Sequence, residues 1–146
     1  MNIETIKLLV IFITLIVATF TDVKKKIIPD KLNAAALLLG IVFWFLGDRK
    51  IYYLASIAIA FTLLMILAFA TDGKIGGGDI KLLSVLGLYV GLLDWCMMIF
   101  ISTMIFLFVI IAKMVRRKIK EGVVFAPYIL VGYLVTIGIK YLPLLQ

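Results

Sequence analysis

Six long apolar runs, separated by short polar stretches, leave this chain few ways to fold. The runs lack a regular alternation of polar and apolar residues, which argues for helices rather than membrane strands. With 65% hydrophobic residues and a mean hydropathy of +1.24, the chain also carries more apolar surface than a soluble domain buries. The sequence therefore predicts an all-α membrane bundle of about six transmembrane helices in a single domain, 1–146. The expected helices are Ile6 to Val23, Leu32 to Leu46, Ile51 to Ala70, Ile80 to Leu93, Trp95 to Ala112 and Val123 to Leu142, of which the second and fourth are short for a full span.

Basic residues are distributed unevenly between alternate loops, and this bias predicts the orientation. One side has Lys24, Lys25, Lys26, Lys31, Lys74, Lys81, Lys113, Arg116, Arg117, Lys118 and Lys120, and the other has Lys7, Arg49, Lys50 and Lys140. Cytoplasmic loops retain Lys and Arg, so we expect a multi-pass protein of the cell membrane with both termini outside. The same bias accounts for the net charge of +7, so we expect the lipid bilayer and no nucleic acid as a partner.

The residues that are missing exclude several classes of membrane enzyme. The chain has no histidine, which excludes Ser/His catalysis, His-ligated zinc and His-based proton relays. It has one cysteine, Cys96, which allows neither an internal disulfide nor a Cys-x-x-C metal site, and which is predicted near the outer face. We therefore expect chemistry without a metal or another cofactor.

Two aspartates are candidates for that chemistry because each is predicted at the cytoplasmic membrane face. Asp79 follows the glycines Gly76 to Gly78 and precedes an apolar run, a pattern that also fits an ordinary helix N-cap. Asp22 ends the first run, where the helix macrodipole disfavours an anion. Acids near the membrane are functional candidates, and two at one face suggest an aspartyl protease. Asp72 fits a turn residue, and it is the substitute if Asp79 is not the second acid.

Several other residues near these two aspartates or at helix ends have structural interpretations. Pro29 is expected to start the second helix, with Asp30 or Asn33 free to cap it, and Asp94 is expected to cap a helix at the outer face. Lys81, two residues beyond the second candidate aspartate, either stabilises its anion, contacts an acidic residue of a substrate, or extends to the membrane interface.

Three blocks together resemble the type IV prepilin peptidases, a family of GxGD-type membrane aspartyl proteases. Asp22, followed by basic residues and Ile28-Pro29-Asp30, is similar to the block of the first catalytic aspartate. The run Gly76-Gly77-Gly78-Asp79-Ile80-Lys81-Leu82-Leu83 is similar to the GxGD block, and Phe125-Ala126-Pro127-Tyr128 partly resembles the block that opens the last helix. The paired Cys-x-x-C motifs of larger members are absent, so the resemblance implies a short form that lacks the N-terminal methyltransferase region.

The resemblance implies an endopeptidase that cleaves the basic leader from prepilin-like membrane proteins, after a glycine, at the cytoplasmic face. Its catalytic pair would be Asp22 and Asp79, one carboxyl ionised and one protonated. Residues for substrate binding or loop support would be Gly76, Gly78, Lys81, Pro29 and Pro127. Two alternatives remain: a small transport protein in which the two aspartates bind a proton or cation, and an assembly scaffold that needs neither acid.

Overall fold

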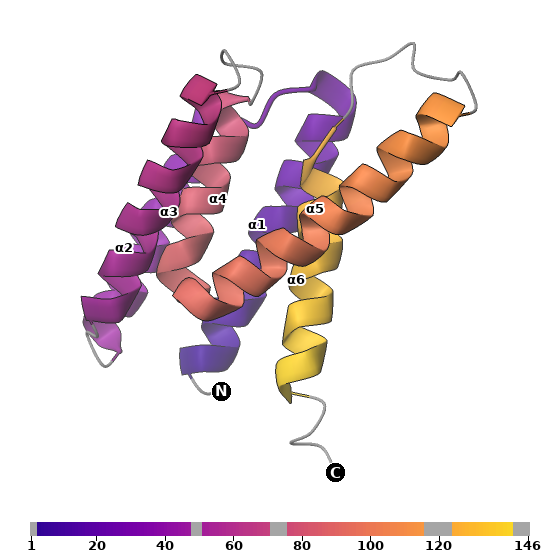
Figure 1. Cartoon of the computed structure of the whole chain (residues 1–146). Coiled ribbons are helices and arrows are strands. Elements are labelled where there is room, and N and C mark those ends of the chain that lie inside the picture. Colours follow the sequence, from indigo (N-terminus) through magenta and orange to yellow (C-terminus); the bar gives the residue numbers. More distant parts are fainter. Residues whose placement is uncertain (1–2, 48–50, 71–75, 116–123, 142–146) are drawn as a thin grey trace.

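The chain forms a bundle of helices. The computed structural model describes residues 3–47, 51–70, 76–115 and 124–141. Every regular element within these ranges is a helix (Figure 1). The helices are α1 (Ile3–Lys25), α2 (Asp30–Leu46), α3 (Ile51–Ala70), α4 (Gly77–Val90), α5 (Leu92–Val115) and α6 (Ala126–Tyr141). The all-helical architecture and the six elements predicted from the apolar runs are confirmed.

Three of these helices are long and apolar enough to cross a membrane. They are α1, α3 and the Leu92–Lys113 part of α5, while the apolar part of α6, Ala126–Lys140, is shorter. Large apolar side chains stay exposed on them: Phe20 is 59% exposed, Phe69 76% and Phe108 75%. A soluble monomer rarely exposes so much apolar surface, whereas lipid tails accept it. The chain is therefore a membrane protein.

Helix α4 forms the centre of the bundle although it has only 14 residues. It packs against α1, α2, α3 and α5, and most of its side chains are buried, with Leu82 and Leu86 at 0% and 1% exposure. Apolar side chains pack equally well against lipid and against protein. The apolar run of α4 therefore resembles that of a helix that crosses the membrane. Because neighbouring helices surround α4, it does not need the length that a lipid-facing helix requires.

Close contacts through small residues hold α4 in this position. A Cβ on Gly87 would lie 3.1 Å from the carbonyl oxygen of Ser56 in α3, so the two helices approach closely there. The φ angle of Gly91 is +81°, and a Cβ there would also meet the ring of Tyr52 at 2.4 Å. Glycine is therefore required at the sharp corner between α4 and α5.

The chain direction brings several helix ends together. Helix α1 begins and α6 ends at one end of the bundle, whereas α1 ends and α2, α4 and α6 begin at the opposite end (Figure 1). Asp22 lies in the last turn of α1 and Asp79 in the first turn of α4. Both candidate aspartates therefore lie at the end of the bundle opposite the beginning of α1 and the end of α6.

Candidate active site

Asp22 is held by the beginning of α6. Its side chain is 7% exposed, and its Oδ2 accepts hydrogen bonds from the backbone N–H groups of Phe125 at 3.1 Å and Ala126 at 3.0 Å. The first N–H groups of a helix have no partner within the helix and carry the positive end of its dipole. They complement the negative charge that the end of α1 disfavours, so Asp22 is oriented by backbone groups more than 100 residues away.

Pro127 fits the start of the helix that presents these N–H groups. It is the second residue of α6, and proline has no N–H of its own to satisfy at the start of a helix. The sequence predicted that Pro127 opens the last helix, but the role of the two preceding N–H groups was missed. A proline at the start of a later helix was the available signal, because it marks backbone N–H groups that can bind a carboxylate such as that of Asp22.

Asp79 does not cap its helix. The N-cap of α4 is Gly76, with no side-chain hydrogen bond, and Asp79 stands three residues later in the first turn. Its Oδ1 is buried and has no hydrogen-bond partner among the described residues. The interpretation of Asp79 as an ordinary N-cap is therefore wrong.

The two carboxyl groups interact electrostatically. Asp79 lies outside the three membrane-spanning helices. Burial and, to a smaller extent, the negative charge of Asp22 raise the pKa of the Asp79 carboxyl from 3.8 to about 6. Both effects disfavour the ionised form of Asp79. The fold thus brings together the two aspartates that the sequence singled out, although they are far apart along the chain.

The three glycines before Asp79 have different surroundings. A Cβ on Gly76 would lie 3.0 Å from Oδ2 of Asp79, and a Cβ on Gly78 would lie 3.1 Å from both Cβ and the carbonyl oxygen of Ile28. A Cβ on Gly77 would meet nothing within 4 Å. The first and third glycines are therefore needed for close approach, whereas the middle position accepts a side chain.

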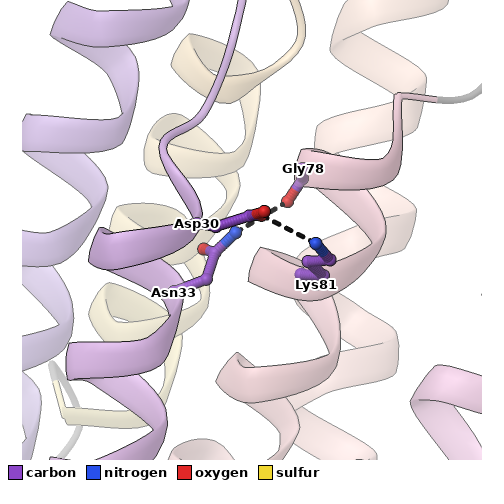
Figure 2. Close-up of polar contacts among 4 residues, drawn as sticks. All are labelled: Asp30, Asn33, Gly78 and Lys81. Atoms are coloured by element: carbon purple, nitrogen blue, oxygen red, sulfur yellow. Dashed lines mark hydrogen bonds and ion pairs between the residues drawn. The ribbon is translucent and has the colours of Figure 1, made fainter.

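Two side-chain contacts join the start of α2 to the start of α4 (Figure 2). Asn33 donates from Nδ2 to the carbonyl oxygen of Gly78 at 3.2 Å, and Lys81 donates from Nζ to Oδ1 of Asp30 at 2.7 Å. The N-cap residue of α2 is Pro29, with no side-chain cap bond, so the predicted capping by Asp30 or Asn33 is wrong. The ammonium group of Lys81 is directed to Asp30. Its predicted contacts with the Asp79 anion or with an acidic residue of a substrate stay predictions.

Comparisons with known proteins give the family. Residues 9–112 match the model of the type IV leader peptidase family. The chain belongs to this family. It is 33% identical over 105 residues to the prepilin leader peptidase/N-methyltransferase of Bacillus subtilis, and 32% identical over 88 residues to prepilin peptidase EppA of Methanocaldococcus jannaschii. These alignments cover 66% and 59% of this chain and 40% and 24% of the relatives, so the chain spans less than half of either relative. No solved structure gives a significant match.

The family match includes both candidate aspartates but ends before the start of α6. The partial resemblance of the Phe125 to Tyr128 block thus stays a prediction. Asp94 lies inside the first turn of α5 and forms an ion pair with Lys140 of α6, so its predicted role as an N-cap is wrong. Asp72 lies outside the described residues.

Proposed function

We propose that this member of the type IV leader peptidase family is a membrane aspartyl endopeptidase. Its substrates would be prepilin-like membrane proteins, from which it removes a basic leader at the cytoplasmic membrane face. The observation that carries the proposal is the pairing of two carboxyl groups in different environments: Asp22 is buried and has two N–H donors, and Asp79 is half-buried and has a raised pKa. The peptidases among its relatives support the same reaction.

Peptide hydrolysis needs one carboxylate to accept a proton from water and one carboxylic acid to donate a proton to the peptide oxygen. The two N–H groups of α6 complement a negative charge on Asp22, so we assign it the role of base. The raised pKa of Asp79 favours a protonated carboxyl, so we assign it the role of acid. Water gives a proton to Asp22 and attacks the peptide carbonyl carbon, while Asp79 gives its proton to the carbonyl oxygen. The C–N bond of the tetrahedral intermediate then breaks, the leaving amine takes up the proton held by Asp22, and the hydroxyl group returns its proton to Asp79 as the C=O bond re-forms.

The bundle supports this location of the reaction. The candidate pair lies at the end of the bundle where α1 ends and α4 begins, and the lysines that follow Asp22 are exposed at that end. Basic residues favour the cytoplasmic side. A precursor with a cytoplasmic basic leader and an apolar helix would place the bond between them at this level of the membrane. Cleavage after a glycine at that junction follows from the family resemblance.

The test is coexpression with a model precursor that has a basic leader, a glycine and an apolar helix, scored by the gel shift of the cleaved product. Asp22→Asn and Asp79→Asn should each lower the rate about a thousandfold, because amides exchange no proton near neutral pH. Asp30→Asn and Asp94→Asn are the matched controls and should remain active, since their contacts are ion pairs with exposed lysines. Cleavage by both the Asp22→Asn and the Asp79→Asn variants would refute these two aspartates as the catalytic pair, whereas a parent that does not cleave would refute the protease and leave the transport alternative.

A further inference from the structure

Asn33 is a buried polar side chain whose position capping does not explain. It lies in the first turn of α2, is 4% exposed, and uses its Nδ2 group to reach the carbonyl oxygen of Gly78 in α4 (Figure 2). The bond joins residues 45 positions apart. Gly78 directly precedes Asp79, so the bond contacts the peptide group that joins these two residues.

The hydrogen bonding of this amide is incomplete. Oδ1 of Asn33 is buried without a hydrogen-bond partner among the described residues. Burial of a polar group costs free energy unless it is bonded, and an apolar side chain of similar size would avoid that cost. Stability alone is therefore a poor explanation for an asparagine here. The hydrogen bond to Gly78 is a better explanation for asparagine at this position.

The other contacts between α2 and α4 do not hold the start of α4 in the same way. The buried hydrogen bond from Tyr89 Oη to the carbonyl oxygen of Ala36 lies near the end of α4, away from Asp79. The ion pair of Lys81 with Asp30 is exposed, at 52% and 74% of the two side chains, and exposed pairs contribute little to a fixed geometry. Gly78 also lies against Ile28, in the segment before α2, and this contact limits how closely the two segments approach without fixing the rotation of the Gly78 peptide unit. The hydrogen bond from Asn33 adds a directional contact, from a buried donor on another helix, to the Gly78 carbonyl group within the first turn of α4.

We propose that Asn33 is a positioning residue for Asp79, acting through the backbone of Gly78. The inference rests on the proposed peptidase function. Catalytic groups must be held close to their productive geometry, and a displacement of about 1 Å can cost a hundredfold in rate. Loss of the bond should therefore slow the chemical step without weakening the binding of a precursor, because both partners of the bond belong to the bundle itself.

The experiment compares Asn33→Leu, which keeps the approximate size but removes the donor, with Ser84→Ala. Ser84 is a matched control because it is a buried polar residue of α4 whose hydroxyl donates to the carbonyl oxygen of Ile80 in its own helix. The full chain is purified in detergent and assayed with the model precursor. For Asn33→Leu we expect kcat to fall on the order of 10- to 100-fold while KM stays within about twofold. For Ser84→Ala we expect both constants to remain close to those of the parent.

Hydrogen exchange gives a readout that does not depend on catalysis. Loss of one hydrogen bond should raise amide exchange in the first turn of α4 about fivefold in Asn33→Leu, and leave the start of α6 unchanged. If Asn33→Leu does not fold, Asn33→Ala is measured in the same way, because it also lacks the donor and introduces no extra bulk.

The outcomes separate this inference from the proposed function. If the parent cleaves the precursor and Asn33→Leu has the same kcat and the same exchange, Asn33 does not position Asp79 and the peptidase stands. A rise in KM with unchanged kcat, or faster exchange throughout the bundle, would also overturn the positioning role. If the parent does not cleave but exchange changes only in α4, the contact with Gly78 is confirmed and the proposed function fails, together with the catalytic part of the inference.

Discussion

Replacement of the glycines before Asp79 by alanine, one at a time, tests how the carboxyl group is held. Alanine at position 77 meets nothing within 4 Å, whereas alanine at 78 meets Ile28 at 3.1 Å and alanine at 76 meets the carboxylate of Asp79 at 3.0 Å. The three substitutions are chemically identical. Any difference between them therefore reports on the surroundings of each position.

The structure gives each substitution its own expected magnitude. Gly77→Ala should stabilise the protein by roughly 0.5–1 kcal/mol, because Gly77 is the first residue of α4 and alanine loses less backbone entropy in a helix. In Gly78→Ala the lower backbone entropy stabilises the protein by a similar amount, but the new methyl group must displace the backbone of Ile28. Overpacking of this kind costs roughly 1–3 kcal/mol, so we expect a net loss of about 1 kcal/mol in the free energy of unfolding. Gly76→Ala displaces only the end of the flexible Asp79 side chain, so stability should change little while the carboxyl group turns away from its position.

Stability is measured by thermal unfolding of the purified proteins in detergent, and activity by cleavage of the model precursor. Gly77→Ala should be at least as stable and as active as the parent. Gly78→Ala should lose both stability and activity, and Gly76→Ala should lose about 10- to 100-fold in activity with little change in stability. If Gly77→Ala is as damaging as Gly78→Ala, the close contacts do not decide which glycines are needed and the reasoning fails.

Three further predictions concern the charge of the site, the packing and the topology. Because the pKa of Asp79 is raised from 3.8 to about 6, the folded protein binds this proton more tightly than the unfolded chain and loses stability as pH rises from about 4 to about 6. Asp79→Asn should therefore unfold at a higher temperature than the parent above pH 6, with a gain that disappears towards pH 4; parallel pH dependences would contradict this. Gly132→Ala should lower the unfolding temperature, because its Cβ would lie 2.1 Å from Oγ of Ser102, while Gly138→Ala should not, since nothing lies within 4 Å; equal losses would refute the close packing of α5 on α6. Cys96 lies near the start of α5, at the predicted outer end, and should react with a membrane-impermeant thiol reagent from outside the cell, whereas labelling from the cytoplasmic side alone would reverse the predicted orientation.

The number and approximate positions of the helices were predictable from hydropathy because each element is built mainly on one apolar run. The central position of α4 was not predictable, since Leu82 to Val90 are mostly apolar, and such a run has the same composition whether lipid or protein surrounds it. Its nine buried residues follow from packing on four other helices, and that information is spread over the whole chain. Length was the available signal, because a helix of 14 residues is short for a span.

The two candidate aspartates were predictable individually, but their supports were not. Asp22 is bonded by N–H groups at positions 125 and 126, and Gly78 by the side chain of Asn33. Both bonds join segments that are distant in sequence, and no local pattern encodes the partner. Capping preferences instead suggested local roles for Asn33 and Asp79. These predictions failed because Asn33 bonds to another helix and Asp79 lies inside its own helix, beyond the cap position.

Backbone groups provide much of the support for this candidate site. Two N–H groups of α6 hold Asp22, the absence of side chains at Gly76 and Gly78 makes room for the carboxyl group of Asp79 and for Ile28, and Asn33 contacts a carbonyl oxygen. A site built in this way needs few polar side chains beyond its two acids. A small number of polar side chains suits a bundle of apolar helices, because each additional buried polar side chain costs free energy unless it is paired. It also predicts where substitutions matter: side chains around the pair should tolerate apolar exchange, whereas the two glycines, Asn33 and the start of α6 should not.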